Sequence, residues 1–279
     1  MNIVDAIVHL VNNPVTQIVE YYSGSNRANN AGDALEEYIK DLFADTFEMT
    51  EGERVEKLSE VFSYLGNKSN PPDAMIRNGD AIEVKKIETE TAALALNSSY
   101  PKHKLKKSST MLSQACKSAE VWTEKDIIYA VGVVKNNNLK RLCMVYGLDY
   151  CASEDCYERI RSTIKTGVES IPGVDFTETR ELGHVNKVDP LGITYLRVRG
   201  MWGIENPWKV FSYIYEKPDD KQFDFMCVIE QNKWNSFNNT DQLSLLQEND
   251  DRININAVRI KDPDNPALLH DAKLITFSF

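Results

Sequence analysis

The chain has 279 residues, of which 42% are apolar and 27% are charged, and its formal net charge at pH 7 is −10. These fractions are typical of a folded globular protein and exclude a disordered or collagen-like chain. The longest apolar run, Ile127–Val134, is far shorter than the roughly 20 residues of a membrane-spanning helix, and five cysteines without a secretion signal favour reduced thiols in the cytoplasm.

Positive charge is concentrated in the middle of the sequence. Residues 1–63 carry 4 basic and 12 acidic side chains, whereas residues 64–141 carry 13 basic and 8 acidic ones. A basic segment within an acidic chain indicates a local phosphate-binding groove. Random variation in a mixed surface would give the same pattern.

Apolar side chains at helical spacing predict three helices near the start of the chain. The strongest covers residues 29–47, where Leu35 and Leu42 share one face. Shorter helices are expected over residues 3–11 and 53–64.

After these helices, the spacing of apolar residues changes to the two-residue alternation typical of β-strands. Two alternating segments, residues 73–77 and 80–86, flank Asn78-Gly79, which is the strongest short-range signal for a β-hairpin. The elements expected after the hairpin are a helix over 109–122, strands over 127–134 and 139–146, a helix over 154–168, strands over 193–198, 210–215, 223–229 and 273–279, and a helix after Asn239. This order predicts an α/β fold with a mixed sheet.

The predicted hairpin carries charged side chains that indicate metal-dependent chemistry. Residues two apart on a strand share a face, so Glu83 and Lys85 project together, and the hairpin register can bring Asp73 beside them. Two carboxylates that close repel each other, and a hard divalent cation such as Mg²⁺ removes the conflict. Such an ion next to a lysine can polarise a phosphodiester and hold an attacking water. The pattern therefore predicts phosphodiester hydrolysis.

Two alternatives compete with this interpretation. A hairpin with a solvated Glu/Lys face would show the same residues without any function. The segments Pro263-Asp264 and Asp271-Ala272-Lys273 fit a loose version of the same pattern, but Pro266 interrupts them and no strand–turn–strand pattern surrounds them.

Pro72-Asp73 and Glu83-Val84-Lys85 together resemble the motif of the PD-(D/E)XK nuclease superfamily. Longer segments are similar to type II restriction endonucleases of the NgoPII-like group. They are residues 31–37, 62–66, 70–75, 77–88 and 197–208. Because these segments span most of the chain, the likeness is not confined to one motif.

The resemblance implies a PD-(D/E)XK nuclease core, with a central mixed β-sheet flanked by helices, and a C-terminal α/β extension. We expect a single restriction-endonuclease domain over residues 1–279, with the catalytic core at about 31–150 and DNA recognition or dimerisation at about 151–279. The implied activity is Mg²⁺-dependent cleavage of both DNA strands at a short palindrome, GGCC for the namesake, by a homodimer. A companion DNA methyltransferase would protect the host. The alternatives are a structure-directed or repair nuclease of the same superfamily and a non-catalytic, sequence-specific DNA-binding protein.

The resemblance also implies roles for individual residues. Asp73 and Glu83 match the metal-binding acids, and Lys85 matches the lysine thought to orient or activate water. Superfamily members often add a glutamate from the preceding helix, for which Glu36 and Glu37 compete. The helical spacing turns Glu36 towards a cleft and Glu37 towards water, which favours Glu36 as a catalytic and metal-binding residue. An acid at that position would also stabilise the helix dipole.

Candidate DNA contacts are spread over the chain. Lysines close to the catalytic strand could clamp phosphates, although a solvated loop would look the same; they are Lys86, Lys102, Lys104, Lys106 and Lys107. Arg197 and Arg199 share a strand face and precede Asn206, and arginine is the best bidentate reader of guanine. Arg27 lies in a polar stretch that is either a DNA contact or a capped loop.

Overall fold

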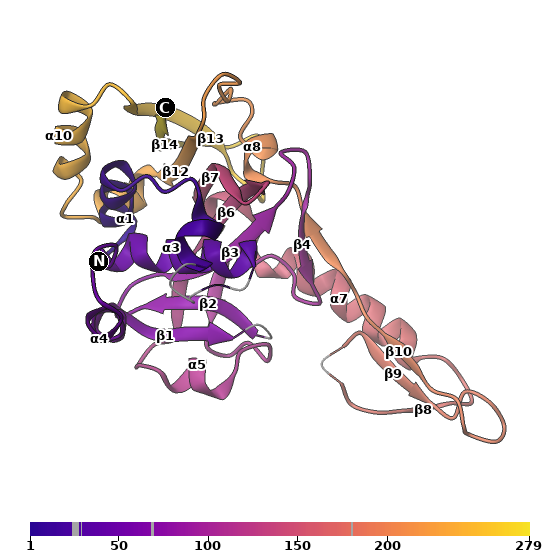
Figure 1. Cartoon of the computed structure of the whole chain (residues 1–279). Coiled ribbons are helices and arrows are strands. Elements are labelled where there is room, and N and C mark those ends of the chain that lie inside the picture. The colour runs from indigo at the N-terminus through magenta and orange to yellow at the C-terminus, as the bar shows by residue number, and fades with distance from the viewer. Residues whose placement is uncertain (24–27, 29, 68–69, 180) are drawn as a thin grey trace.

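The structure is a computed structural model that describes all residues except 24–27, 29, 68–69 and 180. A nine-stranded mixed sheet lies at its centre (Figure 1). The strands follow the order β1 (Phe62–Asn67), β2 (Asn70–Ile76), β3 (Ala81–Ile87), β6 (Glu124–Lys135), β7 (Asn138–Tyr146), β12 (Asp224–Glu230), β14 (Leu269–Ser278) and β13 (Ile253–Lys261), and β5 (Lys104–Lys106) pairs with β6 beside this row.

The middle strands of the sheet are buried on both faces. In β6, Ile128 and Ala130 point to one face and Tyr129 and Val131 to the other, and all four are buried. The pairs β3–β6 and β7–β12 run parallel, and the other neighbouring pairs run antiparallel. Strands from both sides of residue 150 contribute, so one sheet continues across the expected boundary between the two functional parts.

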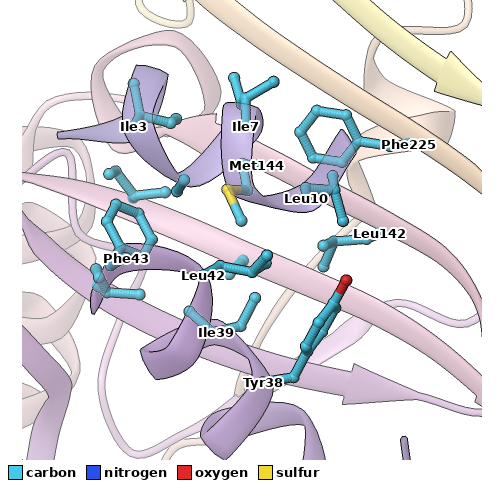
Figure 2. Close-up of a cluster of buried hydrophobic side chains, with 14 of the residues drawn as sticks. Ile3, Ile7, Leu10, Tyr38, Ile39, Leu42, Phe43, Leu142, Met144 and Phe225 are labelled. Carbon is cyan, nitrogen blue, oxygen red and sulfur yellow. The ribbon is translucent and has the colours of Figure 1, made fainter. Parts of the chain in front are cut away.

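Helices cover one face of the sheet and form the larger core cluster. They are α1 (Ile3–Asn12), α2 (Ile18–Ser23), α3 (Ala31–Ala44), α4 (Glu51–Val61), α9 (Gln231–Asn235) and α10 (Asp241–Asn249). Figure 2 shows Ile7 and Leu10 of α1 and Leu42 of α3 close to Leu142 of β7 and Phe225 of β12. The apolar stripe that predicted the helix over residues 29–47 is therefore the side of α3 that packs on the sheet.

Shorter elements cover the opposite face. They are α5 (Gln114–Ser118), α6 (Gly147–Tyr150), α8 (Pro207–Val210) and the ribbon of β4 (Leu94–Asn97) with β11 (Trp202–Ile204). Cys116, Tyr150 and Trp208 from these elements join a second core cluster. With both faces covered, the sheet is a close-packed and rigid support for side chains at its edges.

An arm projects from this body (Figure 1). It consists of α7 (Glu154–Glu169) and a three-stranded sheet of β8 (Asp175–Phe176), β9 (Gly183–Asn186) and β10 (Leu196–Val198). The helix α7 has no buried side chain, and Leu191 and Ile193 between β9 and β10 are 83% and 78% exposed. The arm therefore has little core of its own. Within the described residues, no helix combines the length and the apolar character needed to cross a membrane.

The α/β class with a mixed sheet flanked by helices is confirmed, and so are most of the predicted elements. The Asn78-Gly79 turn joins β2 to β3, and Asn78 has the left-handed φ of 55° that such a turn favours. The elements confirmed with shifts at their ends correspond to α1, α3, α4, α7, α10, β2, β3, β6, β7, β10, β12 and β14.

Two local predictions were wrong, and the strands at both edges of the large sheet were missed. The helix expected over 109–122 is only α5, because the Ser113 side chain accepts the Cys116 N–H and caps a late start. The strand expected over 210–215 is the end of α8 and a turn, because Asn206 and Pro207 provide a strong helix start. The missed edge strands are β1 and β13.

Truncating Leu42 tests the packing of α3 on the sheet. Leu42 is fully buried, so we expect Leu42→Ala to lower the free energy of unfolding by about 2–5 kcal/mol through lost burial and the cavity left behind. Leu245 on α10 is 61% exposed, and Leu245→Ala should cost less than about 0.5 kcal/mol. Urea unfolding followed by tryptophan fluorescence measures both. Equal losses in the two variants would contradict the packing described here.

Candidate active site

The β2–β3 hairpin determines how the predicted acids face each other. The ladder pairs Ala74 with Ile82, and the same register places Asp73 opposite Glu83. Residues opposite each other in an antiparallel pair project from the same face. The Oδ2 atom of Asp73 accepts a 2.6 Å hydrogen bond from the backbone N–H of Val84, which fixes this carboxylate against β3.

Glu83 and Lys85 share that face, as their spacing on a strand requires. The Nζ atom of Lys85 donates a 2.6 Å hydrogen bond to Oε1 of Glu83, and the two side chains are 24% and 14% exposed. The second oxygen of Glu83, Oε2, is buried and has no hydrogen-bond partner among the described residues. A buried, unsatisfied carboxylate oxygen is costly, so it marks a position where a ligand would bind favourably.

Burial and mutual repulsion shift the ionisation of this group. Burial, followed by the charge of Asp73, raises the pKa of Glu83 to about 7. Burial also raises the pKa of Asp73, although the charge of Lys85 opposes this shift. Burial alone would lower the pKa of Lys85, but the charges of Glu83 and Asp73 outweigh it and raise that pKa. The site therefore holds one ammonium and two carboxyls that disfavour full ionisation.

These three side chains line a cavity of about 300 Å³. Its wall also includes Asn70 of β2, Tyr100 and Lys102 from the loop after β4, and Tyr129 of β6. A molecule in this cavity could contact both carboxylates and Lys85 at once. The hairpin residues expected to act together are thus brought together at one hollow of the surface.

Glu36 of α3 interacts electrostatically with the hairpin residues. Burial and then the charge of Asp73 raise the pKa of Glu36, while the charge of Lys85 lowers it. Glu36 in turn contributes to the raised pKa of Glu83. Its carboxylate is therefore within electrostatic range of Asp73, Glu83 and Lys85, although Glu36 is not part of the described cavity wall.

The expectation that Glu37 faces water is wrong. Its side chain is only 17% exposed and accepts 2.6 Å hydrogen bonds from Lys40 and from the buried Arg54. Arg54 also pairs with Asp41, which is fully buried in α3. Glu37 therefore belongs to a buried ion-pair network that joins α3 to α4, and its carboxylate is already engaged.

The donor set of the cavity fits a hard divalent cation. Among the residues that the structure describes, no three His, Cys, Asp or Glu side chains already stand close enough to enclose a metal. Mg²⁺ is usually held by only one or two carboxylates and completes its shell with water and substrate phosphate oxygens. Asp73 and the oxygen of Glu83 that has no described partner supply such a pair, and Glu36 is within electrostatic range of both.

The lysines expected to contact phosphates occupy different places. Lys102 lines the cavity, whereas the other four do not belong to its described wall. Three of these are ion-paired at the surface: Lys86 with Glu88, Lys104 with Glu124 and Lys106 with Glu154. Lys107 is half-buried in the turn after β5. Of this set, only Lys102 lies where it could reach a group bound between Asp73 and Lys85.

The two arginines expected to read bases lie on the arm. Arg197 and Arg199 both pair with Glu181, at 2.7 Å and 2.6 Å. They are about half exposed and stand apart from the cavity wall. Arg27, the remaining predicted DNA contact, lies outside the described residues.

Asn206 does not fit its expected place at a DNA surface. It is fully buried, and its amide nitrogen donates to the backbone oxygens of Glu90 and Ala92. Its side-chain oxygen accepts the N–H of Lys209 and caps α8. Every polar atom of this side chain is used within the fold, so a base could not reach it.

The second Pro-Asp segment forms no comparable cluster. Asp264 accepts hydrogen bonds from the backbone and hydroxyl of Ser153. Asp271 is 78% exposed beside Arg259 on the outer strands. Neither carboxylate lines the cavity, in agreement with the sequence context that disfavoured this segment.

Two tyrosines of the cavity wall were missed by the sequence interpretation. The hydroxyl of Tyr129 accepts a 2.6 Å hydrogen bond from the backbone N–H of Lys102, and the ring of Tyr100 lies beneath the Lys102 ammonium. A hydroxyl inside the apolar run Ile127–Val134 needs a partner, and this was the available signal for Tyr129. Tyr100 lies in a loop that gives no such signal.

Comparisons with known proteins agree with the resemblance. The model of a family described as NgoPII restriction endonuclease matches residues 1–261. The chain is 60% identical over 278 residues to the type II restriction enzyme NgoPII of Neisseria gonorrhoeae, which covers 99% of each chain. No solved structure matches.

The raised pKa of Glu83 predicts a measurable effect on stability in metal-free buffer. Between its ordinary value of 4.5 and about 7, the folded protein holds a proton that the unfolded chain has released. The contribution of Glu83 to the free energy of unfolding therefore falls as the pH rises through this window. Glu83→Gln keeps the neutral shape, so we expect it to be more stable than the wild type at pH 8 in EDTA.

The same comparison at pH 5 is the control for this prediction. There the wild-type Glu83 is mostly protonated, and the stability difference between the two proteins should shrink. Urea unfolding at both pH values measures it. If Glu83→Gln were less stable than the wild type at pH 8, the ionised form of Glu83 would not destabilise the folded protein. This result would contradict the raised pKa of Glu83.

Proposed function

Because this chain belongs to the NgoPII restriction endonuclease family, we propose that it hydrolyses phosphodiester bonds in both strands of DNA at a short palindrome, with Mg²⁺ as its cofactor. Family membership makes the chain a type II restriction enzyme, that is, a site-specific deoxyribonuclease that uses a divalent metal. The choice of Mg²⁺, the recognition site, the PD-(D/E)XK assignment and the roles of individual residues are parts of the proposal.

The observation that carries the proposal is the unpartnered Oε2 of Glu83 beside Asp73 and Lys85. Two buried carboxylates facing one cavity are unfavourable in the free protein, because burial raises the pKa of both and the charge of Asp73 raises that of Glu83 further. A divalent cation would neutralise both and satisfy the free oxygen. The alternative is a hairpin whose Glu/Lys face is solvated and has no function. Such a face would have neither a buried oxygen without a partner nor a cavity.

We assign a separate role in hydrolysis to each charged residue of the cavity. When bound, Mg²⁺ supplies charge neutralisation for the phosphate and its leaving oxygen. Asp73, fixed by the Val84 N–H, and Glu83 would hold the ion, with Glu36 within electrostatic range of both. Lys85, an ammonium with a raised pKa, would orient the attacking water and stabilise the negative charge that develops on the phosphate. Closely packed strands on both sides keep these groups in place, which is how such a site gains from preorganisation.

The recognition site that we propose is GGCC. The support is the 60% identity to the namesake enzyme over nearly the whole chain. A palindrome is matched by two-fold symmetry of the protein, so we propose a homodimer in which each copy cuts one strand. We propose that the part at about 151–279 serves DNA recognition or dimerisation and that a companion methyltransferase protects host DNA at the same site.

Plasmid digestion tests the proposed activity. A plasmid that lacks GGCC methylation should give discrete bands with the wild-type protein in Mg²⁺ and remain intact in EDTA. Lys85→Ala should cut at least about 100-fold more slowly, since it removes a fixed cation that would orient the water and stabilise developing negative charge. Mapped ends at GGCC would agree with the proposed site.

Each other result has a distinct meaning. Bands whose ends map elsewhere would refute GGCC but keep the restriction activity. A smear or cuts at branched DNA would indicate a structure-directed nuclease. Intact plasmid under every condition, with sequence-specific binding retained, would leave a non-catalytic DNA-binding protein.

A matched pair of variants separates the two glutamates of α3. Glu36→Gln should slow cleavage by roughly 10- to 100-fold, the usual effect of losing a group that supports a metal ligand, with little change in stability. Glu37→Gln should lower the free energy of unfolding by about 1–3 kcal/mol, because it weakens a charged hydrogen bond of Arg54. Single-turnover cleavage and urea unfolding give both quantities. If Glu37→Gln were the slower enzyme and Glu36→Gln the less stable protein, the assignment would be reversed.

A further inference from the structure

Four basic side chains are buried among the described residues, and one of them differs from the rest. Three are neutralised by carboxylates: Arg54 by Asp41 and Glu37, Lys125 by Glu120, and Arg141 by Asp224 and Glu90. The fourth, Lys102, is only 8% exposed. No described carboxylate lies within ion-pair distance of its ammonium.

A buried charge without a counterion is unfavourable, which is why almost all buried charges in proteins are paired. Burial also disfavours the charged form of Lys102 and lowers its pKa to about 8. The nearby acid Glu154 does not neutralise it, since its two oxygens accept hydrogen bonds from the Tyr100 hydroxyl and from Lys106. The free protein therefore keeps an ammonium at a position that would be stabilised by an incoming anion.

The fold holds Lys102 firmly at this position. Its Nζ lies 3.6 Å from the centre of the Tyr100 ring, an arrangement in which the ring face attracts a cation. Its backbone N–H donates to the Tyr129 hydroxyl at 2.6 Å. A side chain at Gly147 would come within 2.3 Å of the Lys102 carbonyl oxygen, so the loop packs directly on α6. Lys102 is thus a fixed part of the wall.

Lys102 stands where two hollows meet. One is the cavity of Asp73, Glu83 and Lys85. The other is a groove of about 210 Å³ with many side-chain hydroxyls. The residues common to both are Ser98, Ser99, Tyr100, Lys102 and Met111. The groove continues along Ser108, Ser109 and Thr110 on one side and along Glu154, Glu158 and Arg161 of α7 on the other. Hydroxyl groups commonly bind the phosphates and sugars of a DNA backbone.

We propose that Lys102 is a second cation of the active site, which binds a non-bridging oxygen of the phosphodiester being cut, and that the cut strand continues past it into the hydroxyl-lined groove. This inference rests on the proposed nuclease function. Lys85 lies beside Glu83 and is committed to it, whereas the ammonium of Lys102 is available to the substrate. Negative charge that builds up on the phosphate during water attack would be stabilised by this fixed ammonium.

The test compares Lys102→Met and Lys102→Arg with Lys57→Met, which changes a surface lysine paired with Glu60 on α4. Single-turnover cleavage of a GGCC duplex in Mg²⁺ measures the rate, fluorescence anisotropy of the same duplex in EDTA measures binding, and thermal melting measures folding. We expect Lys102→Met to cut about 100- to 1,000-fold more slowly and to bind less than about 10-fold more weakly. Lys102→Arg should keep more of the rate, and Lys57→Met should behave as the wild type.

Melting distinguishes this role from a merely structural one. Removing an unpaired buried charge should leave the melting temperature unchanged or higher, whereas loss of a structural cation would lower it. Cleavage by Lys102→Met at the wild-type rate would overturn the inference, and so would a rate lost only in proportion to folded protein. If Lys102→Met failed to fold, a folded Lys102→Arg that cleaves no faster than a folded Lys102→Gln would overturn the inference as well, because the retained charge would then have no effect on the rate. A wild type that does not cut would refute the nuclease function itself, which is a different result.

Discussion

Electrostatic repulsion between Asp73 and Glu83 is built into the hairpin, because the ladder places the two carboxylates opposite each other on one face. The strands cannot move apart to relieve it, since β2 and β3 are anchored in a sheet that is packed on both faces. Three arrangements follow from this constraint. Glu83 tends to stay protonated, Lys85 is drawn to one of its oxygens, and the other oxygen is left without a partner.

The surrounding fold makes such an unfavourable group possible. The two core clusters stabilise the sheet through ordinary burial of apolar side chains, and the buried ion pairs of Arg54 and Arg141 are complete. At the cavity, by contrast, Oε2 of Glu83 lacks a hydrogen-bond partner and Lys102 lacks a counterion among the described residues. Opposite charges that are kept apart in this way are suited to a ligand that carries both signs, such as a phosphate with a divalent cation.

Local signals explain how much of this could be predicted from the sequence. The Asn78-Gly79 turn and the alternation around it are read from neighbouring residues, and they place Asp73, Glu83 and Lys85 together without knowledge of the rest of the fold. The position of Glu37 could not be inferred in this way, because its partner Arg54 comes from the next helix. Asn206 was misjudged for the same reason, since the carbonyl groups that bury its amide lie more than a hundred residues earlier in the chain. Lys102 was one of several lysines in the sequence, and only tertiary contacts separate it from the ion-paired ones.

We expect the arm formed by α7 and β8–β10 to unfold less cooperatively than the body. Its helix buries no side chain, and its described strands pair with one another. The start of α7 contacts the body through Glu154 and Tyr157, which meet Tyr100 and Lys106, so the outer part of the arm could open with the loss of few contacts. Regions of this kind unfold locally at a lower free energy than the core. Backbone amides of the arm should therefore exchange with solvent through a partial opening, while those of β6 and β7 exchange only when the whole sheet unfolds. The molecule thus combines a body of higher stability with an arm of lower stability, and the outer part of the arm can lose its order without disturbing the hairpin.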